Sequence, residues 1–188
     1  MKRFIVAVML GLCSPPAWAG NWADNPDYAN DAEFAKSRAL CGTLRKVDLP
    51  PIDRPDRRKD GGMENCSSEA LYYGIGIPAD PQAAFRCAVL EDADMMFGGD
   101  RILATIYANG KGAPRDLDKA IVLACRTGWA PAEFNGRVRD LDERRRSSAS
   151  GGDFHWCDNA TSGYLTGFCM DQDRRMAEAE RQAELAGI

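Results

Sequence analysis

The chain has 188 residues, of which 45% are hydrophobic and 28% charged, and its formal net charge at pH 7 is −4. This length accommodates one domain, or one domain with a small appendage. A mildly acidic chain argues against nucleic acid and anionic lipid as partners, because both need clustered positive charge, and it is compatible with a basic protein partner.

Residues 1–19 have the three parts of a secretory signal. Two basic residues open the chain, residues 4–13 form a short apolar run, and Ala17 and Ala19 make a small-x-small cleavage site. The apolar run is too short to span a bilayer. A leucine precedes Cys13 where a lipoprotein signal needs a small residue, so we expect cleavage after Ala19. The mature protein is then periplasmic or secreted, has no membrane anchor, and carries a net charge of −6 because two basic residues are lost.

Export places the cysteines in an oxidising compartment, where an even number of them indicates a disulfide framework. Six cysteines follow the signal, and they allow fifteen pairings. They are Cys41, Cys66, Cys87, Cys125, Cys157 and Cys169. Zinc binding is the alternative, but the chain has no Cys-x-x-Cys pair and a single histidine. We therefore expect disulfides, with no metal and no cofactor.

The first predicted element is a helix over about residues 29–44, where alanine, phenylalanine and leucine recur in steps of three and four. A polar lead-in at residues 20–30 precedes it. Residues 48–63 contain three prolines, two adjacent glycines and a dense mixture of charges, which predicts a surface loop.

The most informative pattern is an internal repeat. GIGIPADPQAAF (residues 74–85) and GKGAPRDLDKAI (residues 110–121) align at a fixed offset of 36 residues. The identical pairs are Gly74 and Gly110, Gly76 and Gly112, Pro78 and Pro114, Asp80 and Asp116, Ala84 and Ala120, and Ala88 and Ala124. A repeat of this length with matched apolar flanks indicates stacked helical hairpins.

The residue types in each copy are typical of helix–loop–helix. Gly74 and Gly110 follow apolar helical runs, where a left-handed residue ends a helix at low cost. Asp80 and Asp116 stand where an N-cap belongs. A phosphate-binding loop is the alternative, but it needs a preceding strand and, in the Walker form, Gly-Lys before Ser or Thr. A helical run precedes each copy and a glycine follows Lys111, so we expect no nucleotide.

At these residues the chain resembles the Sel-one-like repeat family, arrays of helical hairpins related to tetratricopeptide repeats. LATIYANGKGAPRDLDKAIVLA (residues 103–124) matches the family unit well, and EALYYGIGIPADPQAAFRCA (residues 69–88) matches it loosely. The resemblance implies an all-α fold, a short solenoid-like array of antiparallel hairpins with units near 66–92 and 100–128, within a domain spanning 20–143. It also implies a protein-binding scaffold whose consensus residues are not catalytic.

Two units leave apolar faces open, because each hairpin of such an array is covered by the next. Helices near residues 29–46 and 131–146 are expected to cap the two ends. Disulfides are expected to add roughly a few kcal/mol of stability per bridge.

The hairpin geometry favours one disulfide. Cys66 and Cys87 lie at similar heights on the antiparallel helices that the first loop joins, which predicts a Cys66–Cys87 bridge. Cys41 and Cys125 then remain for each other, and their connectivity stays open.

The C-terminal piece begins with RRRSSASGGD (residues 144–153), which is charged, then rich in Ser and Gly, and predicts a linker. Residues 154–188 resemble the start of the LprI-type N-terminal domain of lysozyme inhibitors. The matching residues are Cys157, Ala160, Thr161 and Cys169. The resemblance implies a Cys157–Cys169 pair and an inhibitor-like role. The alternative is a disulfide-pinned loop ahead of a terminal amphipathic helix.

Other candidate residues have plainer structural explanations. His155 stands between two aromatic residues and is expected to pack with them instead of acting as a base, because the cysteines it would activate are expected in bridges. An acidic group lies around residues 91–100 and lacks the alternating spacing of a calcium loop, so we expect a solvated connection. Its members are Glu91, Asp92, Asp94 and Asp100.

Three further features complete the inventory. Glu33 and other scattered carboxylates have no spacing that marks an acid–base pair. Arg144 to Arg146 are expected in a solvated linker. Asn65 and Asn159 begin glycosylation triplets, which matter in a eukaryotic secretory pathway.

The sequence thus favours a non-enzymatic, exported binding protein that uses the concave face of its hairpins. The resemblances suggest two narrower roles: inhibition of a lysozyme-like hydrolase, or neutralisation of a toxin, with acidic charge steering a basic partner. The alternatives are a hydrolase with converging carboxylates and a purely structural envelope protein.

Overall fold

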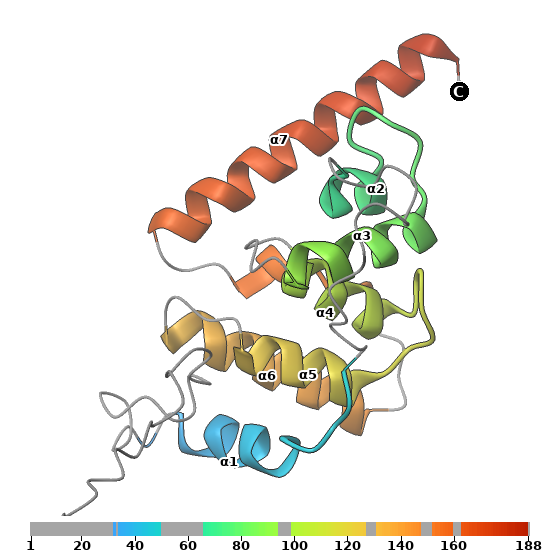
Figure 1. Ribbon diagram of the computed structural model, residues 1–188. Coiled ribbons are helices and arrows are strands. Elements are labelled where there is room, and N and C mark those ends of the chain that lie inside the picture. Colours follow the sequence, from blue (N-terminus) through green and yellow to red (C-terminus); the bar gives the residue numbers. More distant parts are fainter. Residues whose placement is uncertain are drawn as a thin grey trace, which may run out of the picture.

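The computed structural model describes residues 32, 34–49, 66–93, 99–126, 131–147, 152–159 and 163–187. Within these ranges every regular element is a helix (Figure 1), which confirms the expected all-α class. The predicted signal at residues 1–19, Glu33, Asn65 and Asp94 lie outside the described residues.

The described residues contain seven α-helices and one short 3-10 helix. They are α1 (Ala35–Thr43), α2 (Ser68–Tyr73), α3 (Pro81–Ala93), α4 (Gly99–Asn109), α5 (Leu117–Arg126), α6 (Pro131–Arg146), the short 3-10 helix η4 (Trp156–Asn159) and α7 (Gly163–Ala186). Helices α2 to α6 pack in sequence order, each on the next, as a hairpin array (Figure 1).

The two hairpin loops have the same local structure. Gly74 and Gly110 have φ angles of 73° and 70° and end α2 and α4. Asp80 Oδ1 accepts a hydrogen bond from the N–H of the third residue of α3 at 2.9 Å, and Asp116 Oδ1 does the same for α5 at 3.0 Å. Both aspartates are therefore N-caps, as predicted.

The stacking of the second hairpin on the first depends on Gly112. Its φ is 100°, and a Cβ at this position would lie 2.2 Å from the carbonyl oxygen of Pro81, at the start of α3. Gly76 holds the same place in the first loop, with φ of 73°, and a Cβ there would meet nothing within 4 Å. In the second loop, the glycine spacing that resembles a phosphate loop thus serves close packing between the repeats.

Helices α1 and α6 both lie at the α5 end of the array, because α1 contacts α5 and α6 (Figure 1). Ser37 Oγ donates a hydrogen bond to Asn135 Oδ1 at 2.6 Å, and the Cys41–Cys125 disulfide ties α1 to α5. The expectation that these helices cap opposite ends is therefore wrong. The disulfide explains the placement, since it holds α1 beside the second repeat.

Three disulfides join the described cysteines: Cys41–Cys125, Cys66–Cys87 and Cys157–Cys169. Cys66–Cys87 and Cys157–Cys169 are the pairs expected above, and Cys41–Cys125 settles the pairing that was open. The bridges Cys41–Cys125, Cys66–Cys87 and Cys157–Cys169 close chain separations of 84, 21 and 12 residues. Such a framework indicates an oxidising, extracytoplasmic environment. Among the helices that the structure describes, none combines the length and the apolar character needed to cross a membrane.

The linker predicted at residues 144–153 starts three residues too early, because residues 144–146 are helical. Helix α6 continues to Arg146, and its last turn is held by ion pairs from Arg144 Nε to Asp140 Oδ1 at 2.9 Å and from Arg146 Nη2 to Asp142 Oδ2 at 2.7 Å. Cations at a helix C-terminus and acidic residues one turn earlier both favour the helix. The arginines are therefore helical.

The two equivalent glycines provide a matched test of the stacking. Gly112→Ala should lower the free energy of unfolding by more than about 2 kcal/mol, because it adds a clash with Pro81 to the cost of a left-handed alanine. Gly76→Ala should cost only about 1 kcal/mol, since it incurs the backbone cost alone. Chemical denaturation of the oxidised protein measures both values, and equal losses would contradict the packing role of Gly112.

Candidate functional site

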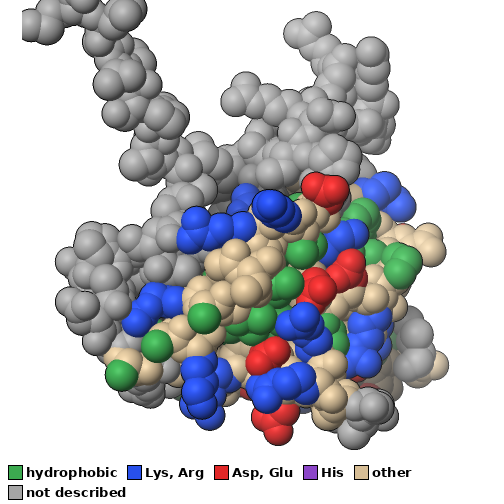
Figure 2. Space-filling view, turned by 90° about the horizontal axis from the view of Figure 1, so that it is seen from below, with side chains coloured by type: hydrophobic (Ala, Val, Ile, Leu, Met, Phe, Trp, Pro, Cys, Tyr) green, Lys and Arg blue, Asp and Glu red, His purple; other side chains and the backbone are tan. Residues whose placement is uncertain are grey.

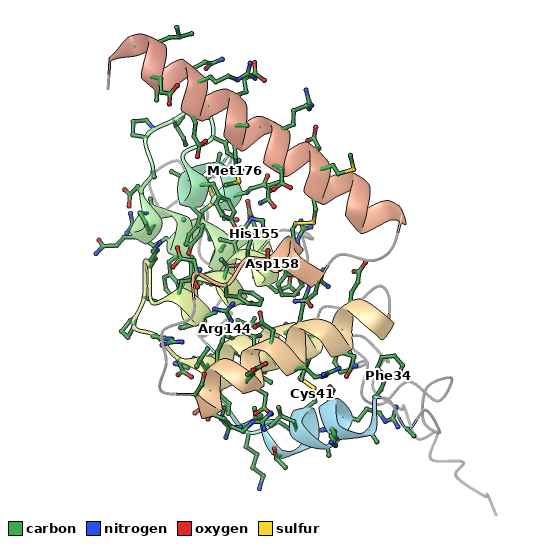
Figure 3. The ribbon with its side chains drawn as sticks, turned by 180° about the vertical axis from the view of Figure 1, so that it is seen from behind. Phe34, Cys41, Arg144, His155, Asp158 and Met176 are labelled. Atoms are coloured by element: carbon green, nitrogen blue, oxygen red, sulfur yellow. A yellow bond between two sulfur atoms is a disulfide. The ribbon has the colours of Figure 1, made fainter. Side chains whose placement is uncertain are left out.

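One face of the array is formed by the first helix of each hairpin, α2 and α4, together with α6. We call it the inner face. Residues 152–159 lie across it, and η4 contacts α4, α6 and α7. Figure 3 shows His155 and Asp158 of this segment between α6 and α7. The surface expected to bind a partner is thus covered by the chain itself.

Asn109, at the end of α4, holds the backbone of this segment at Phe154. Its Oδ1 accepts a hydrogen bond from the Phe154 N–H at 2.7 Å, and its Nδ2 donates to the Phe154 carbonyl oxygen at 2.9 Å. Nδ2 also donates to the Tyr72 hydroxyl at 3.0 Å. One amide side chain therefore satisfies both backbone groups of a residue that is only 1% exposed.

Arg137 of α6 holds the next aromatic residue. Its Nε donates to the Trp156 carbonyl oxygen at 3.0 Å, and its guanidinium lies 4.3 Å from the centroid of the Trp156 ring. Its charge is balanced by Glu133 one turn earlier, at 3.3 Å, and both side chains are buried. Burial lowers the pKa of Arg137 to about 10, against the opposing effect of Glu133. Arg137 remains charged at neutral pH.

Further contacts hold the edges of the segment. Lys111 forms an ion pair with Asp153, and Arg144 of α6 donates to the Gly152 carbonyl oxygen while its guanidinium lies 5.7 Å from the Phe154 ring centroid. His155 packs beside Tyr73, with 5.4 Å between ring centroids. The segment is thus held mainly through its backbone and its rings.

A small cavity of about 130 Å³ lies where α2, α3 and α4 meet η4 and α7. The indole nitrogen of Trp156 is buried beside it and donates to no acceptor among the described groups. The cavity has room for water molecules that accept this hydrogen bond. It is lined by both polar and apolar groups.

Of the predicted acidic group, Glu91 has a structural role at the start of the array. The Glu91 carboxylate accepts hydrogen bonds from the Ser68 N–H at 3.1 Å and from the Ser68 hydroxyl, so it joins α3 to α2. Among the described residues, no group of three His, Cys, Asp or Glu side chains is placed to hold a metal ion.

An open recess of about 1000 Å³ lies between α1 and α6 and extends to the end of η4. Lys36 and Leu40 line it from α1, Gly136 and Arg139 from α6, and Asn159 from η4. Gly136 is needed here, because a Cβ would lie 2.7 Å from Asn159 Oδ1. The recess is a surface hollow with mixed polar and charged walls.

Charge is distributed unevenly along the array. The α1 segment, residues 34–49, carries Lys36, Arg38, Arg45 and Lys46 against one acid, Asp48. Figure 2, seen from the α1 side, shows Lys and Arg side chains spread over this face. Helix α7 at the other end is acidic, with Asp171, Asp173, Glu178, Glu180 and Glu184 against three arginines. The described part of the molecule therefore has a basic end at α1 and an acidic end at α7.

Helix α7 is anchored to the rest of the described chain near its middle, at Cys169 and Arg175. The Cys157–Cys169 disulfide and an ion pair from Arg175 Nη2 to Glu69 Oε2 at 2.8 Å join it to η4 and α2. From residue 180 onward its side chains are exposed, and Leu185 is 89% exposed. This helix presents an acidic surface beyond the array.

Sequence reasoning identified the cysteines, the loop glycines and the capping aspartates, all of which are structural. It missed Asn109 and Arg137, the two residues that hold the segment on the inner face. Asn109 directly precedes the loop glycine Gly110, and Arg137 lies one turn after Glu133. A buried pair at this spacing looks the same in sequence as a solvated helical ion pair.

The chain matches no protein-family model, no curated protein and no solved structure.

Burial of Tyr73 predicts a loss of stability at alkaline pH. Desolvation raises the pKa of its phenol, so the folded protein keeps a proton that the unfolded chain loses above pH of about 10. The free energy of unfolding should then fall by up to about 1.4 kcal/mol per pH unit for this group. Tyr73→Phe should reduce the slope in urea denaturation between about pH 10 and 11.5. An unchanged slope would show that this phenol ionises equally in both states.

The buried pair in α6 gives a second test. Glu133→Gln leaves the Arg137 charge buried and unbalanced, so it should lower the free energy of unfolding by about 3 kcal/mol. Glu143→Gln, an exposed site on the same helix, is the control and should change stability by less than about 0.5 kcal/mol. Similar values for both variants in chemical denaturation would mean that the pair contributes nothing.

Proposed function

We propose that this protein is an exported, non-enzymatic binding scaffold of the bacterial envelope, placed in the periplasm or secreted, and that a protein partner docks in the recess between α1 and α6. The observation that carries the proposal is the recess itself. A partner needs a concave surface that the chain leaves open, and the inner face is filled by residues 152–159.

The basic α1 wall of the recess supports an acidic partner surface. Four acids also line the recess: Asp140 and Asp142, which are each paired with an arginine of α6, and Glu143 and Asp158. Lys36 and Arg139, on the two walls, are exposed and form no ion pair within the described chain. Exposed cations without an ion-pair partner attract an acidic partner and orient it, and they raise the association rate more than the affinity.

A second candidate is inhibition of a lysozyme-like hydrolase, or neutralisation of a toxin, by α7. The resemblance to LprI-type domains suggests it, and the exposed acidic half of α7 supports it, because a basic enzyme is steered toward such a surface. The Cys157–Cys169 bridge holds the start of α7 to η4, which limits its motion on binding.

Two charge reversals distinguish the docking surfaces. The mature, oxidised protein is used to capture partners from an envelope extract, and each captured protein is identified by mass spectrometry and purified for titration calorimetry. Lys36→Glu with Arg139→Glu should weaken the recess partner at least tenfold, while Glu178→Lys with Glu184→Lys should leave it unchanged. If a muramidase or toxin is captured and only the α7 reversals weaken its binding, α7 is the docking surface and the second candidate is supported.

Two results would contradict the scaffold proposal as a whole. One is turnover of a glycan or peptide by the pure protein, which would favour an envelope hydrolase. The other is a failure of the oxidised protein to capture any partner that depends on either surface, which would favour a purely structural role.

A further inference from the structure

The contacts of residues 152–156 are those of a bound peptide. Three backbone positions of this segment are hydrogen-bonded by side chains of the array: the Gly152 carbonyl, both groups of Phe154 and the Trp156 carbonyl. The side chains that make these bonds come from α4 and α6. Backbone bonds of this kind hold any extended chain, whatever its sequence, in one register.

Alternate side chains of the segment supply the selectivity. Residues 153–155 have no regular secondary structure, and Phe154 and Trp156, two positions apart, are 1% and 4% exposed. Asp153 between Gly152 and Phe154 is exposed and pairs with Lys111. Trp156 is the first residue of the 3-10 helix η4, and its ring and the ring of Phe154 are both buried against the inner face.

The rings enter a surface that is suited to them. Arg137 stacks on Trp156, Arg144 lies over Phe154, and the two rings contact each other edge to face with centroids 6.5 Å apart. Buried aromatic residues beside arginine are the usual centres of binding energy in protein interfaces. Phe154 and Trp156 therefore act as two anchors.

We propose that the inner face is a peptide-binding groove that this chain fills with its own residues 152–156. In their place the groove accepts, from another protein, a segment in which an acidic residue is followed by two aromatic residues with one residue between them. Residues 152–156, the cis segment, specify this occupant. A partner segment of the same pattern would make the same backbone hydrogen bonds, place its two rings in the same positions and pair its acidic residue with Lys111. This site is separate from the recess between α1 and α6 and does not depend on it.

The cis segment competes with any such partner. A tethered ligand has an effective concentration of the order of millimolar. A free peptide of the same sequence must therefore reach about this concentration to replace it. A chain whose own rings are removed leaves the two ring positions vacant and competes only through its backbone bonds. This difference provides the test.

The probe is a fluorescent peptide with the sequence of residues 152–159 and serine in place of Cys157. The receptor is the full-length oxidised protein carrying Phe154→Ala and Trp156→Ala. Fluorescence anisotropy should show binding at least tenfold tighter than to the wild-type chain. The control peptide has alanine at both aromatic positions and should not bind. Adding Asn109→Leu to the receptor should reduce the affinity at least tenfold.

A second measurement does not require the anchor variant to fold. Wild-type protein labelled with ¹⁵N is titrated with the unlabelled peptide to millimolar concentration, and hydrogen exchange of the Phe154 amide is followed. Displacement should remove the protection that the bond to Asn109 provides, and the control peptide should not. Retained protection at millimolar peptide, or a folded anchor variant that does not bind, would overturn the proposal and leave the segment as ordinary core.

Discussion

The constraint on which the structure depends is that a helical hairpin has apolar faces that only a neighbouring element can cover. Two repeats cover one another at a single interface, where Gly112 meets the start of α3. Every remaining face must be covered by something outside the repeat. Helices α1 and α6 cover the α5 end, and the segment with Phe154 and Trp156 covers the inner face. The rest of the fold follows from this need.

The disulfides help to cover the same faces, because each of them holds one of the covering or stacking elements in place. Cys41–Cys125 ties α1 to α5, Cys66–Cys87 closes the first hairpin, and Cys157–Cys169 joins η4 to α7. The bridges reduce the conformational freedom of the unfolded chain, which matters most where a short array has little interface to stabilise it. Disulfide formation therefore stabilises the folded array, and it agrees with an extracytoplasmic environment.

Covering the inner face from within the chain has a consequence for binding. The buried rings stabilise the array, yet the same contacts would recognise an aromatic segment of another protein. Polar features remain at the two ends: a basic recess rim at α1 and an acidic helix at α7. The three surfaces for which binding is proposed do not overlap and differ in charge. The proposed functions therefore concern different surfaces and can be separated by variants.

The sequence by itself determined the local elements. The 36-residue offset, the loop glycines and the capping aspartates specify each hairpin, because helix ends depend on residues within a few positions of one another. It also indicated the Cys66–Cys87 pair, which belongs to one hairpin. Only the tertiary structure decided that α1 and α6 share one end, that Asn109 and Arg137 hold Phe154 and Trp156, and that a recess opens beside α1. These facts depend on contacts between residues far apart in the chain, whose partners no local pattern specifies.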